Sequence, residues 1–139
     1  MKKARILIVD DEVTFAKMLR FNLEAVAGYE VDCENSSTRV VDHALEFQPD
    51  LILLDIVMPG LDGGTLKHQL ESHPRLRQIP IIFVTALVSK EDAAGGLFVE
   101  SGGHSMLPKP VELSHLIQAI ESKLANPSPA NPLSRPQDP

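Results

Sequence analysis

The chain has 139 residues, 43% of them hydrophobic, and a formal net charge of −6 at pH 7. This length favours one domain with a single hydrophobic core. The acidic balance argues against direct binding to nucleic acid, because phosphate backbones are bound by surfaces rich in Lys and Arg. Cys33 is the only cysteine, so no internal disulfide can form, which favours a cytoplasmic location. No apolar run approaches the ~20 residues that a membrane helix needs.

Five short apolar runs of strand type alternate with segments of helical periodicity. The expected strands are residues 5–9, 29–33, 51–54, 81–84 and 105–107. The expected helices are residues 13–27, a segment capped by Ser36 or Ser37 that ends before Pro49, a segment that carries Leu66 and Leu70, a weak helix over residues 90–101, and a clear amphipathic helix from Leu113 to Leu124. This alternation predicts an α/β fold with a doubly wound parallel sheet and helices on both faces.

Two stretches of the sequence mark the interior and the end of this domain. Residues 51–54 are apolar at every position, which is typical of a parallel strand that is covered on both faces. Residues 126–139 contain five prolines in 14 residues and almost nothing to bury, which predicts a disordered tail or a truncated linker. We therefore expect one folded domain over residues 1–125.

Polar residues of unusual type follow four of the five expected strands. Asp10 and Asp11 follow the first strand, Asp55 ends the third, Thr85 ends the fourth and Lys109 follows the fifth. Ligands of open parallel sheets bind beyond the carboxyl ends of the strands. We therefore expect these five side chains to meet at one edge of the sheet.

Three carboxylates in one place repel one another unless a proton or a cation intervenes. Mg²⁺ suits such a site, since it takes one or two carboxylates together with waters and phosphate oxygens. No His or Cys is among these positions, which argues against zinc. Phosphoryl transfer depends mainly on positioning and charge neutralisation, with Asp55 available as nucleophile and Thr85 and Lys109 available to bind phosphoryl oxygens.

Each of these residues also has an ordinary structural interpretation. Asp10 and Asp11 can cap the helix that follows, Thr85 is a common strand residue, and Lys109 can be a surface lysine. Asp55 is the hardest to explain in this way, because a carboxylate after four buried residues is costly without a partner. The five histidines are expected to be surface or packing residues. They are His43, His68, His73, His104 and His115.

Taken together, these motifs resemble the receiver domains of two-component response regulators. The matching residues are Asp10-Asp11, Asp55 within DIVMPGLDG (55–63), Thr85-Ala86 and Lys109-Pro110. The resemblance covers roughly residues 4–125 and implies a CheY-like, flavodoxin-like (βα)₅ fold with strand order 2-1-3-4-5. It assigns residues 1–125 to a stand-alone receiver domain and residues 126–139 to the tail.

The resemblance also implies a role for each site residue. Asp55 would be the phosphoacceptor, supplied by a sensor histidine kinase or a histidine phosphotransfer protein. Asp11, Asp55 and the backbone carbonyl of Val57 would ligate Mg²⁺, or Mn²⁺ as the alternative ion, with Asp10 acting mainly through water.

On the same resemblance, Thr85 and Lys109 would bind the phosphoryl group, and the peptide bond before Pro110 would be cis. Such a protein is a signalling switch rather than an enzyme. Its output would be contact with an unknown downstream protein, or a homodimer through the fourth helix, fifth strand and fifth helix.

The sequence departs from this pattern at the switch. Met106 stands where the family has Tyr or Phe, a ring that moves together with the residue at Thr85. The segment between Thr85 and Lys109 is about two residues longer than usual and rich in glycine, so its helix is expected to be short, irregular or mobile. These departures leave open a degenerate receiver that binds proteins without phosphorylation. A phosphatase with an Asp nucleophile is disfavoured, because Val57 occupies the place of its second acid.

Overall fold

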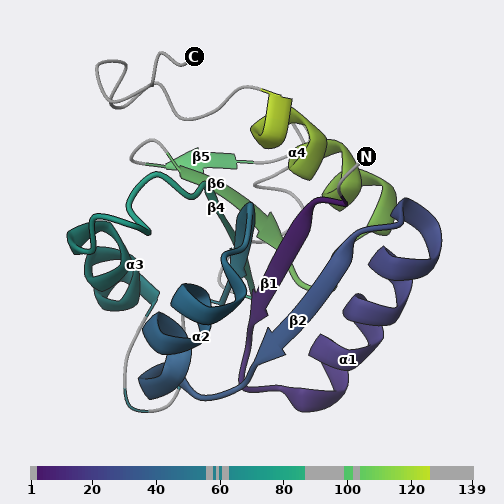
Figure 1. Ribbon diagram of the computed structural model, residues 1–139. Coiled ribbons are helices and arrows are strands. Elements are labelled where there is room, and N and C mark those ends of the chain that lie inside the picture. Colours follow the sequence, from purple (N-terminus) through teal and green to yellow (C-terminus); the bar gives the residue numbers. More distant parts are fainter. Residues whose placement is uncertain are drawn as a thin grey trace.

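A twisted sheet with helices on both faces forms the fold of this computed structural model (Figure 1). The structure describes residues 3–55, 58, 60, 63–86, 99–101 and 104–125. Its strands are β1 (Arg5–Val9), β2 (Glu30–Glu34), β3 (Leu51–Leu54), β4 (Ile81–Thr85), β5 (Val99–Ser101) and β6 (His104–Pro108). Its helices are α1 (Val13–Asn22), α2 (Val40–Phe47), α3 (Gly63–Ser72) and α4 (Leu113–Ala125), with a π-helical turn η1 (Leu23–Ala27) and a 3₁₀ turn η2 (Ser37–Arg39).

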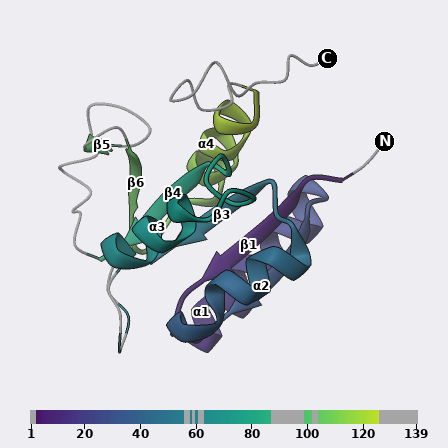
Figure 2. The same cartoon turned by 60° about the vertical axis from the view of Figure 1, so that its left-hand side comes forward.

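The six strands of the described residues lie in the order β2-β1-β3-β4-β6-β5. The first five are parallel, so the predicted order 2-1-3-4-5 is confirmed with β6 as the fifth parallel strand. Figure 2 shows β5 and β6 at the end of the sheet away from α1 and α2. The carboxyl ends of the five parallel strands consequently share one edge.

The prediction of a helix up to residue 101 is wrong at its end. Val99–Ser101 forms β5, which pairs antiparallel with β6. The two strands are separated by Gly102-Gly103, a dipeptide typical of a tight hairpin, and Val99 is β-branched, which favours a strand. Residues 90–98 of the expected helix lie outside the described residues.

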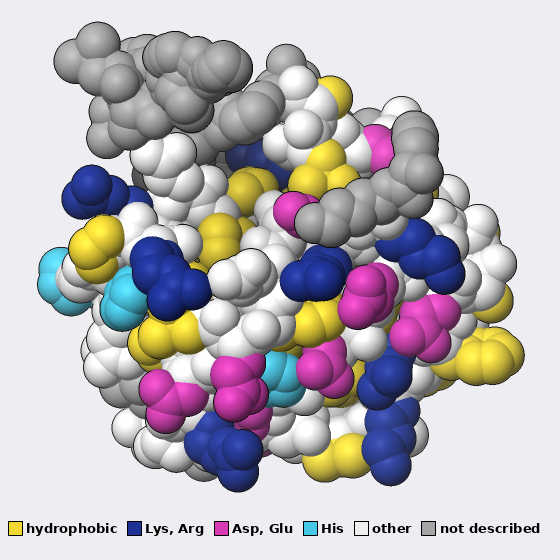
Figure 3. Space-filling model, viewed as in Figure 1, with side chains coloured by type: hydrophobic (Ala, Val, Ile, Leu, Met, Phe, Trp, Pro, Cys, Tyr) yellow, Lys and Arg dark blue, Asp and Glu magenta, His cyan; other side chains and the backbone are white. Residues whose placement is uncertain are grey.

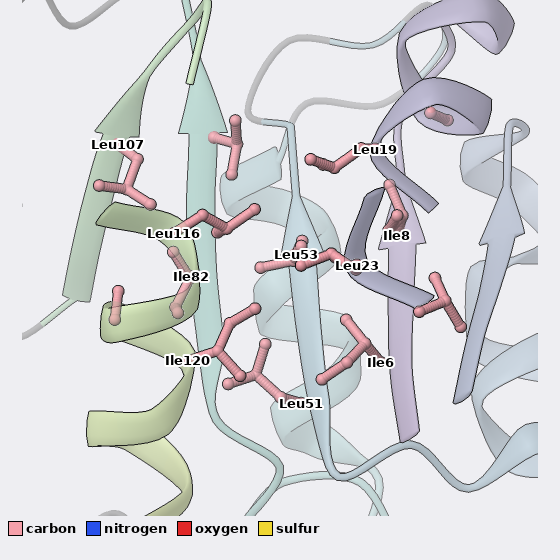
Figure 4. Close-up of a cluster of buried hydrophobic side chains, with 14 residues drawn as sticks. Ile6, Ile8, Leu19, Leu23, Leu51, Leu53, Ile82, Leu107, Leu116 and Ile120 are labelled. Carbon is pink, nitrogen blue, oxygen red and sulfur yellow. The ribbon is translucent and has the colours of Figure 1, made fainter. Parts of the chain in front are cut away.

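Alternate strand residues supply two separate cores, as the two-residue period of a strand requires. Ile6, Ile8 and Leu53 point to the face covered by α1, η1 and α4, where they join the cluster in Figure 4. Leu7 and Val9 point to the opposite face, which α2 and α3 cover. All four residues of β3 are buried, which confirms a central strand covered on both faces.

Two helix boundaries differ from those predicted. The helix expected over residues 13–27 ends as an α-helix at Asn22 and continues as the π-helical η1. Gly28 then ends it as predicted, with φ at 72° and its N–H donating to the carbonyl of Glu24. Neither Ser36 nor Ser37 caps α2, because η2 intervenes and the N-cap residue is Arg39, without a side-chain capping hydrogen bond. None of the helices in the described part of the chain is long and apolar enough to span a membrane.

Candidate functional site

Asp10 and Asp55 lie side by side because their strands are hydrogen-bonded neighbours. β1 and β3 pair with Val9 opposite Leu54, so the residue after each strand emerges at the same edge. The backbone N–H of Asp55 donates to the carbonyl of Val9 at 3.0 Å. The backbone N–H of Asp10 donates in turn to the carbonyl of Glu34 at 3.1 Å, which ties it to the end of β2.

Asp10, Asp11 and Asp55 are brought together as the sequence predicted. One carboxylate oxygen from each lies within 4.8 Å of the other two. Asp10 and Asp55 are buried, with 2% and 7% of their surface exposed, whereas Asp11 is exposed. Burial raises the pKa of the Asp10 carboxyl above its usual value, although a hydrogen bond with Lys109 opposes that rise. A set of three carboxylates offers only oxygen ligands, which suits a hard divalent cation. Such a cation could enter from the exposed side, where Asp11 lies.

Lys109 reaches the same cluster from the end of β6, which is two strands away from β3 in the sheet. Its Nζ lies 2.8 Å from Asp10 Oδ2, 2.8 Å from Glu12 Oε1 and 3.4 Å from Asp55 Oδ2. Burial would lower the pKa of Lys109, but the hydrogen bonds with Asp10 and Glu12 raise it above its usual value. The ammonium therefore stays charged in the position where it touches the carboxylates.

The chain around Lys109 is held to the end of β4. The backbone N–H of Lys109 donates to the carbonyl of Thr85 at 3.0 Å, and the Lys109–Pro110 peptide bond is cis, as the resemblance implied. Thr85 is buried, with 1% of its surface exposed, at the end of the strand next to β3. Its position thus borders the acidic cluster.

Of the expected site residues, one lies away from this cluster and another lies outside the described residues. Met106 is opposite Phe83 in the β4–β6 pairing and packs, half-buried, against the core on the α2 and α3 face. Val57 lies outside the described residues.

The sequence interpretation missed three residues that contact the site. Glu12 pairs with Lys109, the ring of Phe15 lies 4.6 Å from Lys109 Nζ, and Asn35 Nδ2 donates to the carbonyl of Asp10 at 2.8 Å. The sequence feature that could have revealed Glu12 as a site residue is its position directly after Asp10-Asp11. The helix-capping interpretation of Asp10 is wrong, because Glu12 is the N-cap residue of α1 and Asp10 Oδ1 accepts the backbone N–H of Glu12.

Comparison with known proteins agrees with this arrangement. The family model for the response regulator receiver domain matches residues 6–121. The chain is 38% identical over 119 residues to the response regulator PleD of Caulobacter vibrioides, covering 86% of this chain and 26% of PleD. It is 33% identical over 120 residues to the transcriptional regulator RpaA of Synechocystis sp., covering 86% of this chain and 48% of RpaA. The chain thus spans about a quarter and about half of these two relatives.

Among solved structures, a putative response regulator from Chloroflexus aurantiacus superposes with a TM-score of 0.75 and 34% identity. The match covers 89% of this chain and 99% of that one. The family model extends over the strands and helices that build the acidic cluster. The chain therefore belongs to the response regulator receiver domains of two-component regulatory systems.

Proposed function

We propose that this protein is a phosphorylation switch in which Asp55 accepts a phosphoryl group from the phosphohistidine of a sensor histidine kinase or a histidine phosphotransfer protein. The observation that carries this proposal is the convergence of three carboxylates within 4.8 Å, with an ammonium 3.4 Å from Asp55. Receiver domains act in general as signalling switches, and we propose the same here, with no separate substrate turned over.

The chemistry follows from the groups at the site. A carboxylate oxygen of Asp55 would attack the phosphorus, and the P–N bond to the donor imidazole would break. The imidazole nitrogen leaves with the bonding electrons and takes up a proton. The exposed side of the cluster, where Asp11 lies, gives the donor its way in.

A divalent cation would complete this site. Asp11 and Asp55 would hold Mg²⁺, or Mn²⁺, directly, with Asp10 acting through water and the Val57 carbonyl as a further ligand. The cation would neutralise charge on the phosphoryl oxygens. The fit is supported by the buried carboxylates themselves, since burial without a cation raises the pKa of Asp10.

Lys109 and Thr85 would bind the phosphoryl group once it is attached. The Lys109 ammonium lies 3.4 Å from Asp55 Oδ2, and Thr85 lies at the end of the strand next to β3. Movement of Thr85, coupled to Met106, would carry the change to a downstream protein or to a homodimer interface. A cytoplasmic location and a domain boundary at residue 125 belong to the same proposal.

One observation favours a second candidate, a degenerate receiver that binds its partner without phosphorylation. Met106 packs against the core as an apolar side chain and offers no polar tip to the site. The intact set of Asp10, Asp11, Asp55 and Lys109 favours the switch instead.

Phosphorylation by acetyl phosphate decides between the two. Incubation with acetyl phosphate and Mg²⁺ should add the mass of one phosphoryl group to the intact protein. Asp55→Asn should gain none, and omission of Mg²⁺ should prevent the gain. An unmodified wild-type protein under these conditions would refute the switch and support the degenerate receiver.

A further inference from the structure

The ammonium of Lys109 is shared unequally among three carboxylates. Asp10 and Glu12 each lie 2.8 Å from Nζ, whereas the proposed acceptor Asp55 lies at 3.4 Å. The two closest partners thus draw the ammonium to the side of the site formed by the loop after β1. The ammonium must move away from Asp10 and Glu12 before it can approach Asp55 more closely.

Glu12 differs from the other two carboxylates in its surroundings. Its side chain is 62% exposed, against 2% for Asp10 and 9% for Asp55. Its backbone is nevertheless held at both ends, because its N–H donates to Asp10 Oδ1 at 2.9 Å and its carbonyl accepts the N–H of Ala16 at 3.0 Å. The fixed backbone of Glu12 thus holds an exposed carboxylate next to Lys109.

A second group from the same helix holds the ammonium in this position. The centroid of the Phe15 ring lies 4.6 Å from Lys109 Nζ, within the range of a cation–π contact. The start of α1 therefore supplies both a charge and an aromatic face to a lysine 97 positions away from Glu12 in the chain.

The contact with Glu12 matters most once a cation is present. A divalent ion held by the three aspartates would offset two of their three negative charges, whereas Glu12, which is not one of the expected ligands, would keep its full charge beside Lys109. An incoming phosphoryl group needs that same ammonium. Glu12 and the phosphoryl oxygens consequently compete for one charge.

We propose that Glu12 is a positioning residue that holds the Lys109 ammonium back from Asp55 and so slows phosphoryl uptake. The proposal rests on the proposed function of Asp55. Ion pairs with an exposed partner are weak, so the restraint is small and its removal accelerates phosphorylation about two- to five-fold.

The test compares Glu12→Gln with the wild-type protein in acetyl phosphate and Mg²⁺, with the initial rate of phosphorylation followed by intact mass. Gln keeps the length of the side chain and the backbone contacts and removes only the charge. Glu112→Gln is the matched control, because the Glu112 side chain is also 62% exposed and its ion-pair partner is His115. Glu12→Gln should be about two- to five-fold faster, and Glu112→Gln should match the wild-type rate.

A second donor separates positioning from simple repulsion. If Glu12 slowed the reaction by repelling the donor, its loss would accelerate phosphorylation by acetyl phosphate more than by phosphoramidate, which carries less negative charge. If Glu12 acts by holding Lys109, its loss accelerates phosphorylation by both donors equally. Equal acceleration supports the proposal. An unchanged rate in Glu12→Gln, or acceleration confined to acetyl phosphate, overturns it while leaving the proposed function intact. Failure of the wild-type protein to be phosphorylated at all overturns both.

Discussion

His43 forms an ion-pair bridge between α2 and β2 that should make stability depend on pH. Its Nδ1 lies 2.8 Å from Glu34 Oε1 and its Nε2 lies 2.8 Å from Asp32 Oδ2. Because ionised carboxylates only accept hydrogen bonds, both ring nitrogens donate, which requires the imidazolium form. Arg20 is a further charged group near this bridge, with Nη1 4.0 Å from Asp32 Oδ1.

The sign of the effect follows from the pKa of His43. Burial would lower this pKa, but the hydrogen bonds with Asp32 and Glu34 raise it above its usual value of 6.5. A raised folded-state pKa means that the bridge stabilises the protein fully below pH 6.5, the value for the unfolded chain. This stabilisation is lost as the pH rises through the folded-state pKa.

The exposure of the partners gives the size of the effect. The Glu34 side chain is 10% exposed, so its charged hydrogen bond contributes about 1.5–3 kcal/mol. The Asp32 side chain is 41% exposed, and its bond contributes about 0.2–1 kcal/mol. Burial of the imidazolium offsets part of this sum. We expect His43→Gln to lower the free energy of unfolding by about 1–3 kcal/mol when the imidazole is charged.

Urea unfolding at about pH 6 and about pH 9 measures this difference. The gap between wild type and His43→Gln should be present at the lower pH and shrink at the higher one. His115→Gln is the control, because the His115 side chain is 47% exposed and its contact with Glu112 is 3.5 Å long. The control should show no gap at either pH. A His43→Gln gap of equal size at both pH values would refute the imidazolium bridge.

Two further predictions concern the cation and the core. Mg²⁺ at 100 times its dissociation constant should stabilise the folded protein by about 2.7 kcal/mol. Asp11→Asn should lose most of this stabilisation in the same unfolding assay. An equal stabilisation of the variant by Mg²⁺ would contradict the assignment of Asp11 as a ligand. Leu53→Ala should cost about 2–5 kcal/mol, since Leu53 is 1% exposed in the cluster of Figure 4. Val26→Ala, at a position 65% exposed, should change stability by less than about 0.5 kcal/mol, and a similar loss in both variants would argue against that core.

The surface shows why charge composition predicts so little about individual contacts. Figure 3 shows acidic and basic side chains interspersed on the side of the molecule that is seen in Figure 1. The net charge of −6 argues against nucleic acid as a partner but does not say which acidic side chain pairs with which basic one. His43 was expected to be an ordinary surface or packing residue, and its place between two carboxylates from β2 became visible only in the folded structure.

The five parallel strands and the acidic edge could be predicted from the sequence because both depend on strong local patterns. A run such as residues 51–54 has no exposed face, which suits only a central strand. The register of neighbouring parallel strands then carries Asp10 and Asp55 to the same edge. Hydrophobic burial is the largest favourable contribution to folding, so the elements that it dictates are the ones that a sequence reveals most clearly.

β5 and the contacts of Glu12 and His43 were decided by the assembled structure. Val99–Ser101 is a strand through its pairing with the edge of β6, a contact that exists only in the folded sheet. Glu12 meets Lys109 across 97 positions of chain. Long side chains pair at a small gain in free energy, so their partners depend on distances that exist only once the sheet and its helices have packed.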